Sequence, residues 1–401
     1  MRILSVTQSY FPFLDRGGPA VKVRAIAKGL AAHGHRVTVL SADLGFGKNG
    51  TLIAGMHKTR WGCRMDEAGV EAFYLSTLGH YRSLTLNPGV LAFCGASINQ
   101  FDIVHIYGLY DLLGLAVGFF CRRREVPYVL EPMGMYKPIV RNLRRKRIYH
   151  QFLGRSLAHG ARSLIATSVQ EKNELLASGI EASRICVRRN GIEVPAELPP
   201  PGTFRNRWQI PREAKLILFL GRLVSKKSPD LLLDAYARWH LGGGGTVPSV
   251  LVLAGPDEGD GYLQNLETLT SQRGLGDHVL FTGPLYDEAK WAAYVDADVF
   301  VLPSQHENFG NTASEAVACG VPVIITDCCG VAPLIEGRAG LVIKHDVQDL
   351  QAALSQILGD DSSKSRYTSG CSETKAKLSW AEPLNELEAL YKSLITVSRS
   401  R

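Results

Sequence analysis

The sequence predicts an α/β protein built from two doubly wound domains, each a parallel sheet with helices on both faces, that face a cleft. The chain has 401 residues, which is long for one domain and natural for two. Short apolar runs alternate with stretches of helical spacing in both halves. A proline-rich segment containing Pro199, Pro200, Pro201 and Gly202 separates the halves and predicts a linker.

The composition is that of a globular protein. Apolar residues make up 45% of the chain and charged residues 21%. An apolar run of about 18 residues is absent, so no membrane-spanning helix is expected. The first residues, MRILSV, are too short for a signal-peptide core and predict a strand instead. The eight cysteines form no Cys-x-x-Cys pair, which favours reduced thiols and a cytoplasmic location.

The first half begins with a buried strand and a glycine pair. Gly17 and Gly18 stand between that strand and a helix, where they either admit a phosphate or form a simple turn. Ser168 and Glu171 form a capping-box pattern. The predicted strands are 3–7, 37–40, 70–75, 101–106, 126–130 and 164–168, and the predicted helices are 21–33, 81–94 in part, 112–121 and 139–159. Residues 185–192 end the first half and contain an Asn-Gly turn signal. The first domain is expected to cover residues 1–195.

The second half repeats the alternation. Its predicted strands are 216–223, 250–256, 279–285, 299–302, 321–326 and 337–343, and its predicted helices are 229–239, 312–319 and 347–358. Residues 360–372 are polar and predict a mobile connection. The second domain is expected to cover 196–377, and residues 378–401 to form a C-terminal helix that returns to the first domain or caps the second.

Residues 303–327, PSQHENFGNTASEAVACGVPVIITD, predict a loop and helix between two buried strands. The loop lies at the carboxyl end of a strand, where open parallel sheets bind ligands, and the helix N-terminus favours an anion. Glu307 lies in the loop and Glu315 in the first turn of the helix. Ionised carboxylates accept hydrogen bonds and suit hydroxyl-rich ligands. For Glu315 the alternative is stabilisation of the helix dipole.

A basic loop meets the end of the predicted strand 216–223. Arg222 and Lys227 flank the turn before the next helix. A guanidinium and an ammonium at a helix entry can neutralise a diphosphate, and the alternative is a pair of surface cations.

The stretch HENFGNTASEAVACGVPVIITD resembles the Glu-x7-Glu signature of the retaining glycosyltransferases of family 4, which have the GT-B fold of two Rossmann-like domains. In that family the first Glu lies beside the donor sugar and the second holds the nucleotide ribose. GRLVSKKSPDLLLDAY is similar to the segment whose Arg and Lys hold the donor pyrophosphate, with Ser228 in place of the usual Gly. The resemblance covers most of the chain and is weakest over 43–100.

The resemblance implies a set of site residues. The catalytic residues would be Arg222, Lys227 and Glu307. The donor-binding residues would be Gly17, Gly18, Gly221, Gly283, Asn308, Phe309, Gly310, Asn311, Thr312 and Glu315. The acceptor side would hold His105, Met133 and Gly134. Met133 stands where many members carry a His, and His105 is either a substitute or a histidine of the core.

The implied reaction is sugar transfer from a nucleotide-diphosphate sugar to an acceptor hydroxyl, with retention at the anomeric carbon, in polysaccharide or glycolipid assembly. We expect front-face transfer with no metal ion and no cofactor. The alternatives are a nucleotide-sugar epimerase of related fold and a catalytically inactive nucleotide-sugar-binding protein. The donor without acceptor would discriminate between them, because only an epimerase forms product from donor alone.

Net charge is +7, and the excess is local. The basic cluster comprises Arg122, Arg123 and Arg124, then Lys137, Arg141, Arg144, Arg145, Lys146 and Arg147. The cluster predicts binding to an anionic membrane surface, with the protein held peripherally on the inner face of the membrane and acting on a lipid-linked acceptor. The alternative is a helix face that is exposed to solvent. Nucleic acid is not expected, because no binding motif accompanies the charge.

Overall fold

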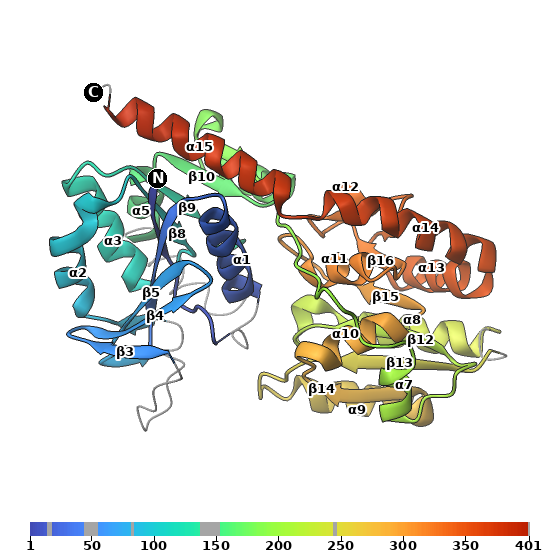
Figure 1. Cartoon of the computed structure of the whole chain (residues 1–401). Helices are drawn as coiled ribbons and strands as arrows, with labels where there is room; N and C mark the ends of the chain where they lie inside the picture. Colours follow the sequence, from blue (N-terminus) through green and yellow to red (C-terminus); the bar gives the residue numbers. More distant parts are fainter. Residues whose placement is uncertain (14–17, 44–54, 82–83, 137–152, 244–246, 400–401) are drawn as a thin grey trace. The chain divides into compact units, whose positions relative to one another are not determined.

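The computed structural model describes residues 1–13, 18–43, 55–81, 84–136, 153–243 and 247–399. The chain forms two compact units. The first unit comprises Met1–Asn190 together with Trp380–Arg401, and the second comprises Gly191–Ser379 (Figure 1). The C-terminal segment therefore belongs to the unit that the N-terminal half builds.

The first unit contains a nine-stranded sheet in the order β11-β10-β9-β8-β1-β2-β5-β4-β3. From β11 to β5 all neighbours pair in parallel, whereas β4 and β3 add an antiparallel hairpin that the sequence did not predict. The bounds are β1 (Arg2–Val6), β2 (Arg36–Ala42), β3 (Met56–Thr59), β4 (Gly62–Glu67), β5 (Val70–Leu75), β8 (Ile103–Tyr107), β9 (Tyr128–Glu131), β10 (Ser163–Ala166) and β11 (Ile185–Val187). A separate hairpin joins β6 (Gly79–Tyr81) and β7 (Leu84–Leu86).

Helices cover both faces of this sheet (Figure 1). Strand residues alternate between the faces, so Leu4 packs with the core under α2 and α3 while Ile3 packs with the core under α1 and α15. The helices are α1 (Gly18–Ala32), α2 (Gly89–Ser97), α3 (Leu112–Arg123), α5 (Arg155–Gly160), α6 (Val169–Ala177) and α15 (Ala381–Arg399). Of the helix predicted at 139–159, residues 139–152 lie outside the described residues. In α6 the side chain of Ser168 accepts a hydrogen bond from the amide of Glu171, as the capping pattern predicts.

Helix α15 is part of the first unit's core. Leu384, Leu387 and Tyr391 are buried with residues of α1 and of the central strands. Gly29 of α1 makes room for this helix, because a Cβ at that position would lie 2.3 Å from Cδ1 of Leu384.

The second unit contains a six-stranded parallel sheet in the order β14-β13-β12-β15-β16-β17. The first strand of the unit, β12, lies between β13 and β15, which is the strand order of a doubly wound nucleotide-binding fold. The bounds are β12 (Lys215–Leu220), β13 (Ser249–Ala254), β14 (Val279–Gly283), β15 (Val299–Leu302), β16 (Val323–Thr326) and β17 (Gly340–Ile343). Among the parallel strands of the first unit β1 occupies the corresponding position, between β2 and β8. The predicted fold class of two Rossmann-like halves is confirmed.

The helices of the second unit are α7 (Thr203–Trp208), α8 (Pro229–Leu241), α9 (Tyr262–Gln272), α10 (Asp287–Asp296), α11 (Asn311–Ala318), α12 (Ala332–Ile335), α13 (Val347–Gly359) and α14 (Asp361–Lys377). The prediction of a mobile segment at 360–372 is wrong, because these residues enter α14. Asp360 caps this helix by accepting from the amides of Ser362 and Ser363 at 3.0 and 3.2 Å. Tyr367, Cys371 and Thr374 are buried at helical spacing, and their mixed polarity concealed the period.

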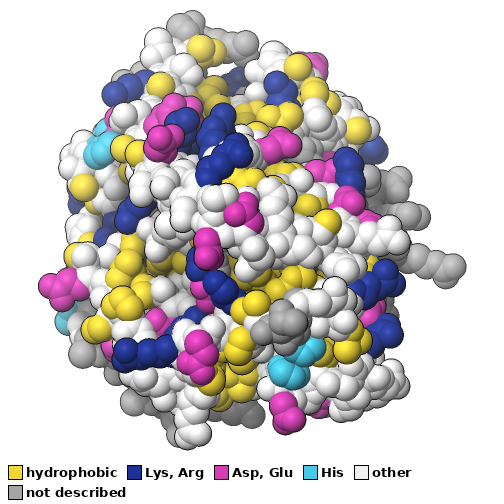
Figure 2. Space-filling view, turned by 90° about the vertical axis from the view of Figure 1, so that its right-hand side faces the viewer, with side chains coloured by type: hydrophobic (Ala, Val, Ile, Leu, Met, Phe, Trp, Pro, Cys, Tyr) yellow, Lys and Arg dark blue, Asp and Glu magenta, His cyan; other side chains and the backbone are white. Residues whose placement is uncertain are grey.

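The surface in Figure 2 carries Lys and Arg side chains interspersed with Asp and Glu and with apolar patches. Among the described residues, none of the helices combines the length and apolar character that crossing a membrane requires.

Candidate active site

Two loops at the carboxyl end of the second sheet are joined by an ion pair between Lys227 and Glu307. Lys227 follows β12 and Glu307 follows β15, and these strands are neighbours at the point where the strand order reverses. The backbone reinforces the junction, since the amide of Gln305 donates to the carbonyl of Lys226 at 3.0 Å. Two residues separated by 80 positions in the chain are thereby held together at the edge where such folds bind ligands.

Glu307 is held on its other side by the loop after β16. Its amide donates to the carbonyl of Cys328 at 2.9 Å, and its carbonyl accepts from Gly330 at 3.0 Å. Burial by itself would raise the pKa of Glu307, but the ammonium of Lys227 outweighs burial and leaves the pKa below its usual value. The carboxylate is therefore ionised and fixed in place.

Glu315 in α11 is held by two residues of α10. Lys290 Nζ lies 2.9 Å from Oε1 of Glu315, and the hydroxyl of Tyr294 donates to Oε2 at 2.9 Å. Tyr294 is fully buried, and burial and the charge of Glu315 both hold its pKa well above the usual value, so it remains a donor. Neither partner was predicted from the sequence, although their spacing of four residues on a helix places them on one face.

Arg222 lies in the loop after β12 and forms an ion pair with Glu258, which follows β13. The guanidinium is 61% exposed. Close packing brings the two loops together, because the amide of Gly221 donates to Ala254 at 2.9 Å and a Cβ on Gly255 would lie 1.7 Å from the carbonyl oxygen of Gly221. A cation is thus presented to solvent at the same edge as Lys227.

The segment from Asn308 to Thr312 comprises the end of the loop and the first residues of α11. Phe309 is buried, and its carbonyl accepts from Val331 at 2.7 Å. Gly310 begins the helix at φ 106°, a conformation that residues with a Cβ rarely adopt. The amides of the first turn of a helix suit an anion, and Thr312 and Asn311 lie in that turn. Gly283 ends β14 at the same edge of the sheet and accepts from Gly255 at 2.9 Å.

The residues predicted for the acceptor side lie in the first unit. Met133 and Gly134 occupy a turn directly after β9. Of the glycine pair predicted for donor binding, Gly18 is the first residue of α1. Gly17 lies outside the described residues. The lysine and arginines at 137–147 also lie outside them.

His105 is fully buried on β8, in the position of a core histidine. Its Nδ1 lies 2.6 Å from the hydroxyl of Tyr391 on α15, and its Nε2 lies 3.4 Å from Oε2 of Glu131. Burial lowers its pKa to about 4, so the ring is neutral near pH 7.

Glu131 is the centre of a buried charge cluster that the sequence analysis also missed. It forms ion pairs with Lys22 of α1 and with Arg188, whose Nη2 lies 2.7 Å from Oε2. Burial would raise the pKa of Glu131, but the two cations hold it well below the usual value. Burial lowers the pKa of Lys22 to about 8.

The chain contains an Asp-x-Asp triplet that the expectation of a metal-free site overlooked. Asp296 and Asp298 precede β15, at the opposite end of that strand from Glu307. Asp296 accepts from the amides of Gly202 and Arg205 at 2.5 and 2.9 Å, and Asp298 accepts from the guanidinium of Arg205 at 2.9 Å. Both carboxylates therefore tie the start of the second unit to its sheet. Over the described ranges, no group of three or more side chains is arranged to hold a metal ion.

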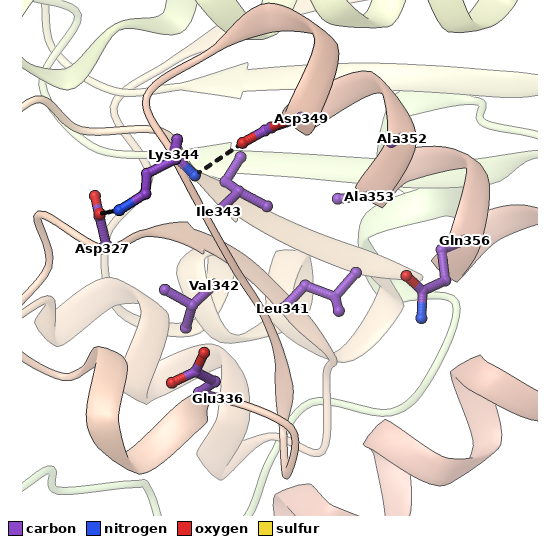
Figure 3. Close-up of a pocket in the computed structure, with 10 residues that line it drawn as sticks. All are labelled: Asp327, Glu336, Leu341, Val342, Ile343, Lys344, Asp349, Ala352, Ala353 and Gln356. Atoms are coloured by element: carbon purple, nitrogen blue, oxygen red, sulfur yellow. Dashed lines mark hydrogen bonds and ion pairs between the residues drawn. The ribbon is translucent and has the colours of Figure 1, made fainter.

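A cavity of about 370 Å³ lies between β17 and α13 (Figure 3). Lys344 pairs there with Asp327 at 2.5 Å, and its amide donates to Asp349 at 3.3 Å. None of the sequence-predicted site residues lines this cavity, so it is separate from the candidate active site.

Comparisons with known proteins identify relatives of both halves of the chain. Residues 202–370 match the family model of the group 1 glycosyl transferases, and residues 17–191 match that of the glycosyl transferase 4-like domain. The D-inositol 3-phosphate glycosyltransferase of Corynebacterium jeikeium is 30% identical over 76% of this chain and 75% of its own. That of Thermomonospora curvata is 27% identical over 94% and 90%.

Solved structures show the same fold at low identity. Sucrose-phosphate synthase from Thermosynechococcus elongatus superposes with a TM-score of 0.73 at 19% identity, covering 99% of both chains. Anabaena Alr3699/HepE, solved in complex with UDP and glucose, superposes with a TM-score of 0.72 at 18% identity, covering 98% of this chain and 100% of its own. Two matching family models, a relative at 30% identity and the shared fold confirm the resemblance: the chain belongs to the group 1 glycosyltransferases, with the GT-B fold.

Proposed function

We propose that this protein transfers a sugar from a nucleotide-diphosphate sugar to an acceptor hydroxyl with retention of configuration. One observation carries the proposal: Lys227 and Glu307 are paired at the strand-order reversal of the second unit, with Arg222 presented at the same edge. Cations beside a fixed carboxylate suit a ligand that combines a diphosphate with a sugar. Family membership and relatives named for glycosyl transfer support the same reaction class.

The second unit binds the donor. Arg222 and Lys227 neutralise the diphosphate, and Glu307 orients the sugar. Glu315 accepts hydrogen bonds from ribose hydroxyls, with Lys290 and Tyr294 fixing its orientation. The amides of Asn308, Phe309, Gly310, Asn311 and Thr312 face the phosphates, and Gly221 and Gly283 leave room for the nucleotide.

The transfer proceeds on one face of the sugar. The bond between the anomeric carbon and the diphosphate oxygen breaks, and the acceptor oxygen bonds to that carbon on the same face while its proton passes to the departing diphosphate. Negative charge grows on the diphosphate as the bond breaks, so Arg222 and Lys227 stabilise the transition state more than the ground state. The scheme requires neither a metal ion nor a cofactor, and activity in excess EDTA is expected.

Lys227 must be shared between Glu307 and the donor. In the structure its ammonium pairs with Glu307, whose carboxylate remains ionised. An ammonium has three donors, so it can keep the carboxylate while it bonds to a phosphate oxygen. The pair thus places the sugar-orienting carboxylate next to the leaving group.

The acceptor binds to the first unit, where Met133 and Gly134 lie after β9. The relatives named D-inositol 3-phosphate glycosyltransferase make a phosphorylated polyol the first acceptor to test. The product would serve polysaccharide or glycolipid assembly.

We also propose a cytoplasmic protein that binds anionic membranes peripherally. On α3, Phe119 is 53% and Leu112 36% exposed, and the exposed Arg122, Arg123 and Arg124 follow at its C-terminal end. Exposed apolar side chains beside cations suit a lipid headgroup layer. Arg141, Arg144, Arg145 and Arg147 lie outside the described residues and would add positive charge to the interaction.

The deciding experiment compares Arg222→Ala and Lys227→Ala with Arg273→Ala. Arg273 is also an exposed arginine of the second unit and pairs with Asp234 at 2.7 Å, away from the candidate site. A thermal-shift panel of UDP, GDP and ADP first identifies the base, because a ligand that binds the folded state raises the melting temperature. With the matching sugar nucleotide, we expect both site variants to lose roughly 10²–10³-fold in turnover.

Near-wild-type turnover in both Arg222→Ala and Lys227→Ala would show that these residues do not stabilise the departing diphosphate. Product formed from the donor alone with its sugar epimerised would indicate the epimerase instead. Nucleotide binding with neither transfer nor hydrolysis over long incubation would indicate an inactive binding protein.

A further inference from the structure

The turn after β9 has an unusual backbone for its sequence. Met133 has φ 55° and Gly134 φ 73°, and the amide of Met135 donates to the carbonyl of Pro132 at 3.2 Å. Two successive left-handed residues across such a hydrogen bond follow the pattern of a type I′ turn, whose central positions favour Gly and Asn. Methionine at the first of them is unfavourable, because its Cβ crowds the backbone. Residues with strain of this kind are common at ligand-binding and active sites.

Glu171 braces the far side of this turn. Its Oε1 accepts from the amide of Gly134 at 2.6 Å. Its Oε2 accepts from the amide and the hydroxyl of Thr167 at 2.8 and 2.9 Å. The residue is 1% exposed and lies in the first turn of α6. The Glu171 carboxylate is therefore buried away from solvent, fixed by Thr167 at the end of β10, and bonded to the amide of Gly134 in the turn.

The residue before the turn, Glu131, is also held in place. Glu131, the last residue of β9, is paired with Lys22 and Arg188, and its carbonyl accepts from Gly108 at 2.8 Å. A Cβ on Gly108 would lie 3.6 Å from Cε of Met133 and 3.3 Å from Cε of Met135. The two methionine side chains therefore lie over the end of β8, which neighbours β1 where the strand order of the first unit reverses.

We infer that Glu171 is a positioning residue for the transfer reaction, holding the turn 132–135 so that the Met133 side chain contacts the bound acceptor. This inference rests on the proposed function, and it adds Glu171, which lies outside the predicted site. A tightly braced turn with a half-buried methionine at its strained position supplies a fixed apolar contact at the carboxyl edge of the sheet. Half-buried apolar surface of this kind suits the apolar face of a sugar ring or an apolar part of the acceptor.

The chain contains a matched turn elsewhere. Ala68 and Gly69 join β4 to β5 with φ 51° and 78°, and both residues are exposed. Ala68→Gly and Met133→Gly therefore relieve the same backbone strain, but only the second removes a side chain from the proposed site. We expect both variants to keep or raise the melting temperature, and Met133→Gly alone to lose at least tenfold in turnover.

The brace itself is tested with Glu171→Gln and Ser168→Ala. Gln has one acceptor oxygen and places an NH₂ group against a donor, so it cannot serve both Gly134 and Thr167. Ser168→Ala removes the cap of the same helix, in which Ser168 accepts from Glu171 N at 3.1 Å, and leaves the link to Gly134. Hydrogen exchange over residues 131–136 should accelerate at least tenfold in Glu171→Gln and remain as in the wild type in Ser168→Ala.

Turnover then separates positioning from stability. With the sugar nucleotide selected by thermal shift and D-inositol 3-phosphate or water as acceptor, we expect Glu171→Gln to lower kcat at least tenfold. The donor KM should change less than threefold, because Arg222, Lys227, Glu307 and Glu315, which bind the donor, lie in the second unit. Glu171→Asp, whose shorter side chain reaches only part of the way, should recover part of kcat.

Equal hydrogen-exchange rates over 131–136 in Glu171→Gln and Ser168→Ala would show that Glu171 does not hold the turn. Equal turnover in Met133→Gly and Ala68→Gly would show that the Met133 side chain makes no contact needed for the reaction. A different result would contradict the proposed function, namely that the wild type neither binds a nucleoside diphosphate nor turns over a sugar nucleotide. The exchange experiment needs neither substrate and still decides whether Glu171 holds the turn.

Discussion

Lys290 and Glu315 form an ion pair of 2.9 Å that joins α10 to the helix carrying the second glutamate of the Glu-x7-Glu motif. With Tyr294 donating to the other carboxylate oxygen, each oxygen of Glu315 has one partner from α10. A carboxylate oxygen accepts more than one hydrogen bond, so both oxygens keep capacity for a ligand. The carboxylate is oriented before any nucleotide arrives, which reduces the entropy lost on binding.

Removing the charge of Glu315 should weaken ribose recognition. Glu315→Gln is expected to lower the affinity for the nucleoside diphosphate about tenfold or more, because a hydrogen bond to a charged group contributes about 1.5–3 kcal/mol. Its preference for the ribose over the 2′- and 3′-deoxy nucleotides should fall by a similar factor. Calorimetry measures both quantities. Glu336→Gln, at an exposed glutamate outside the candidate site, should bind as the wild type does. Unchanged discrimination in Glu315→Gln would contradict the role assigned to this carboxylate.

Glu258 should compete with the donor diphosphate for Arg222. The two residues form an ion pair, and Arg222 is largely exposed. Glu258→Gln releases the guanidinium and removes a negative charge near the proposed diphosphate site. We expect the affinity for the nucleoside diphosphate to rise about two- to tenfold at low salt, with a smaller gain at high salt, where screening is stronger. Titrations at two ionic strengths test this, and weaker binding in Glu258→Gln would show that Glu258 supports Arg222 instead.

His105 should make the first unit sensitive to acid. Its pKa is lowered to about 4 by burial, whereas an unfolded histidine has a pKa of 6.5. Between these values the unfolded chain binds a proton that the folded chain does not, so stability falls as pH falls, by about 1.4 kcal/mol per pH unit for this one group. Glu131, whose pKa is lowered, adds a further loss below pH 4.5.

Urea unfolding at pH 7, 6, 5 and 4 measures this dependence. His105→Gln should lower stability at pH 7 because Tyr391 loses its hydrogen bond to the imidazole, and should flatten the decline between pH 6.5 and 4. His80→Gln, at an exposed histidine of the same unit, should leave the decline as it is in the wild type. A decline of the same slope in His105→Gln would assign the acid sensitivity to other groups.

The close approach of α1 and α15 should make Gly29 intolerant of a side chain. A Cβ there would lie 2.3 Å from Cδ1 and 3.3 Å from Cγ of Leu384. Gly29→Ala is expected to destabilise the protein by about 1–3 kcal/mol through overpacking. Gly95→Ala is the control, because that glycine lies in α2 with nothing within 4 Å of its Cβ position, and it should stabilise by up to about 1 kcal/mol. In a double-mutant cycle, Leu384→Ala should recover part of the loss, and strictly additive effects would contradict the contact.

The basic end of α3 should bind anionic lipid. Replacing Arg122, Arg123 and Arg124 with Gln is expected to weaken co-sedimentation with phosphatidylserine-containing vesicles by up to about 1 kcal/mol per residue. The triple variant of Arg207, Arg212 and Arg273, exposed arginines of the second unit, carries the same charge change and should sediment as the wild type does. Equal loss in both triple variants would indicate attraction by net charge alone, and no loss in either would remove the proposed surface.

Local signals determined much of the candidate site. The apolar run before Pro303, the glycine at 310 and the small residues at helical spacing after it form a strand, a loop and a helix in the structure. Their order in the chain is enough to place Glu307 and Glu315, because a loop that follows a parallel strand must emerge at its carboxyl end. The alternation of strands and helices determined the fold class for the same reason, and the family motif needed only residue types and spacing.

Tertiary packing decided which side chains meet. Lys227 and Glu307 are 80 residues apart, and His105 and Tyr391 are 286 apart, so no local period brings them together. The strand orders β14-β13-β12-β15 and β5-β2-β1-β8 place their loops beside one another. The same holds for Glu171 and Gly134, which meet because β9 and β10 are neighbours. Residue order and local pattern alone set the position of each functional side chain along the chain and the edge of the sheet at which it lies. Only the folded sheets decided its partners, because ion pairs and hydrogen bonds between distant residues form when strand pairing and burial bring them within a few ångströms.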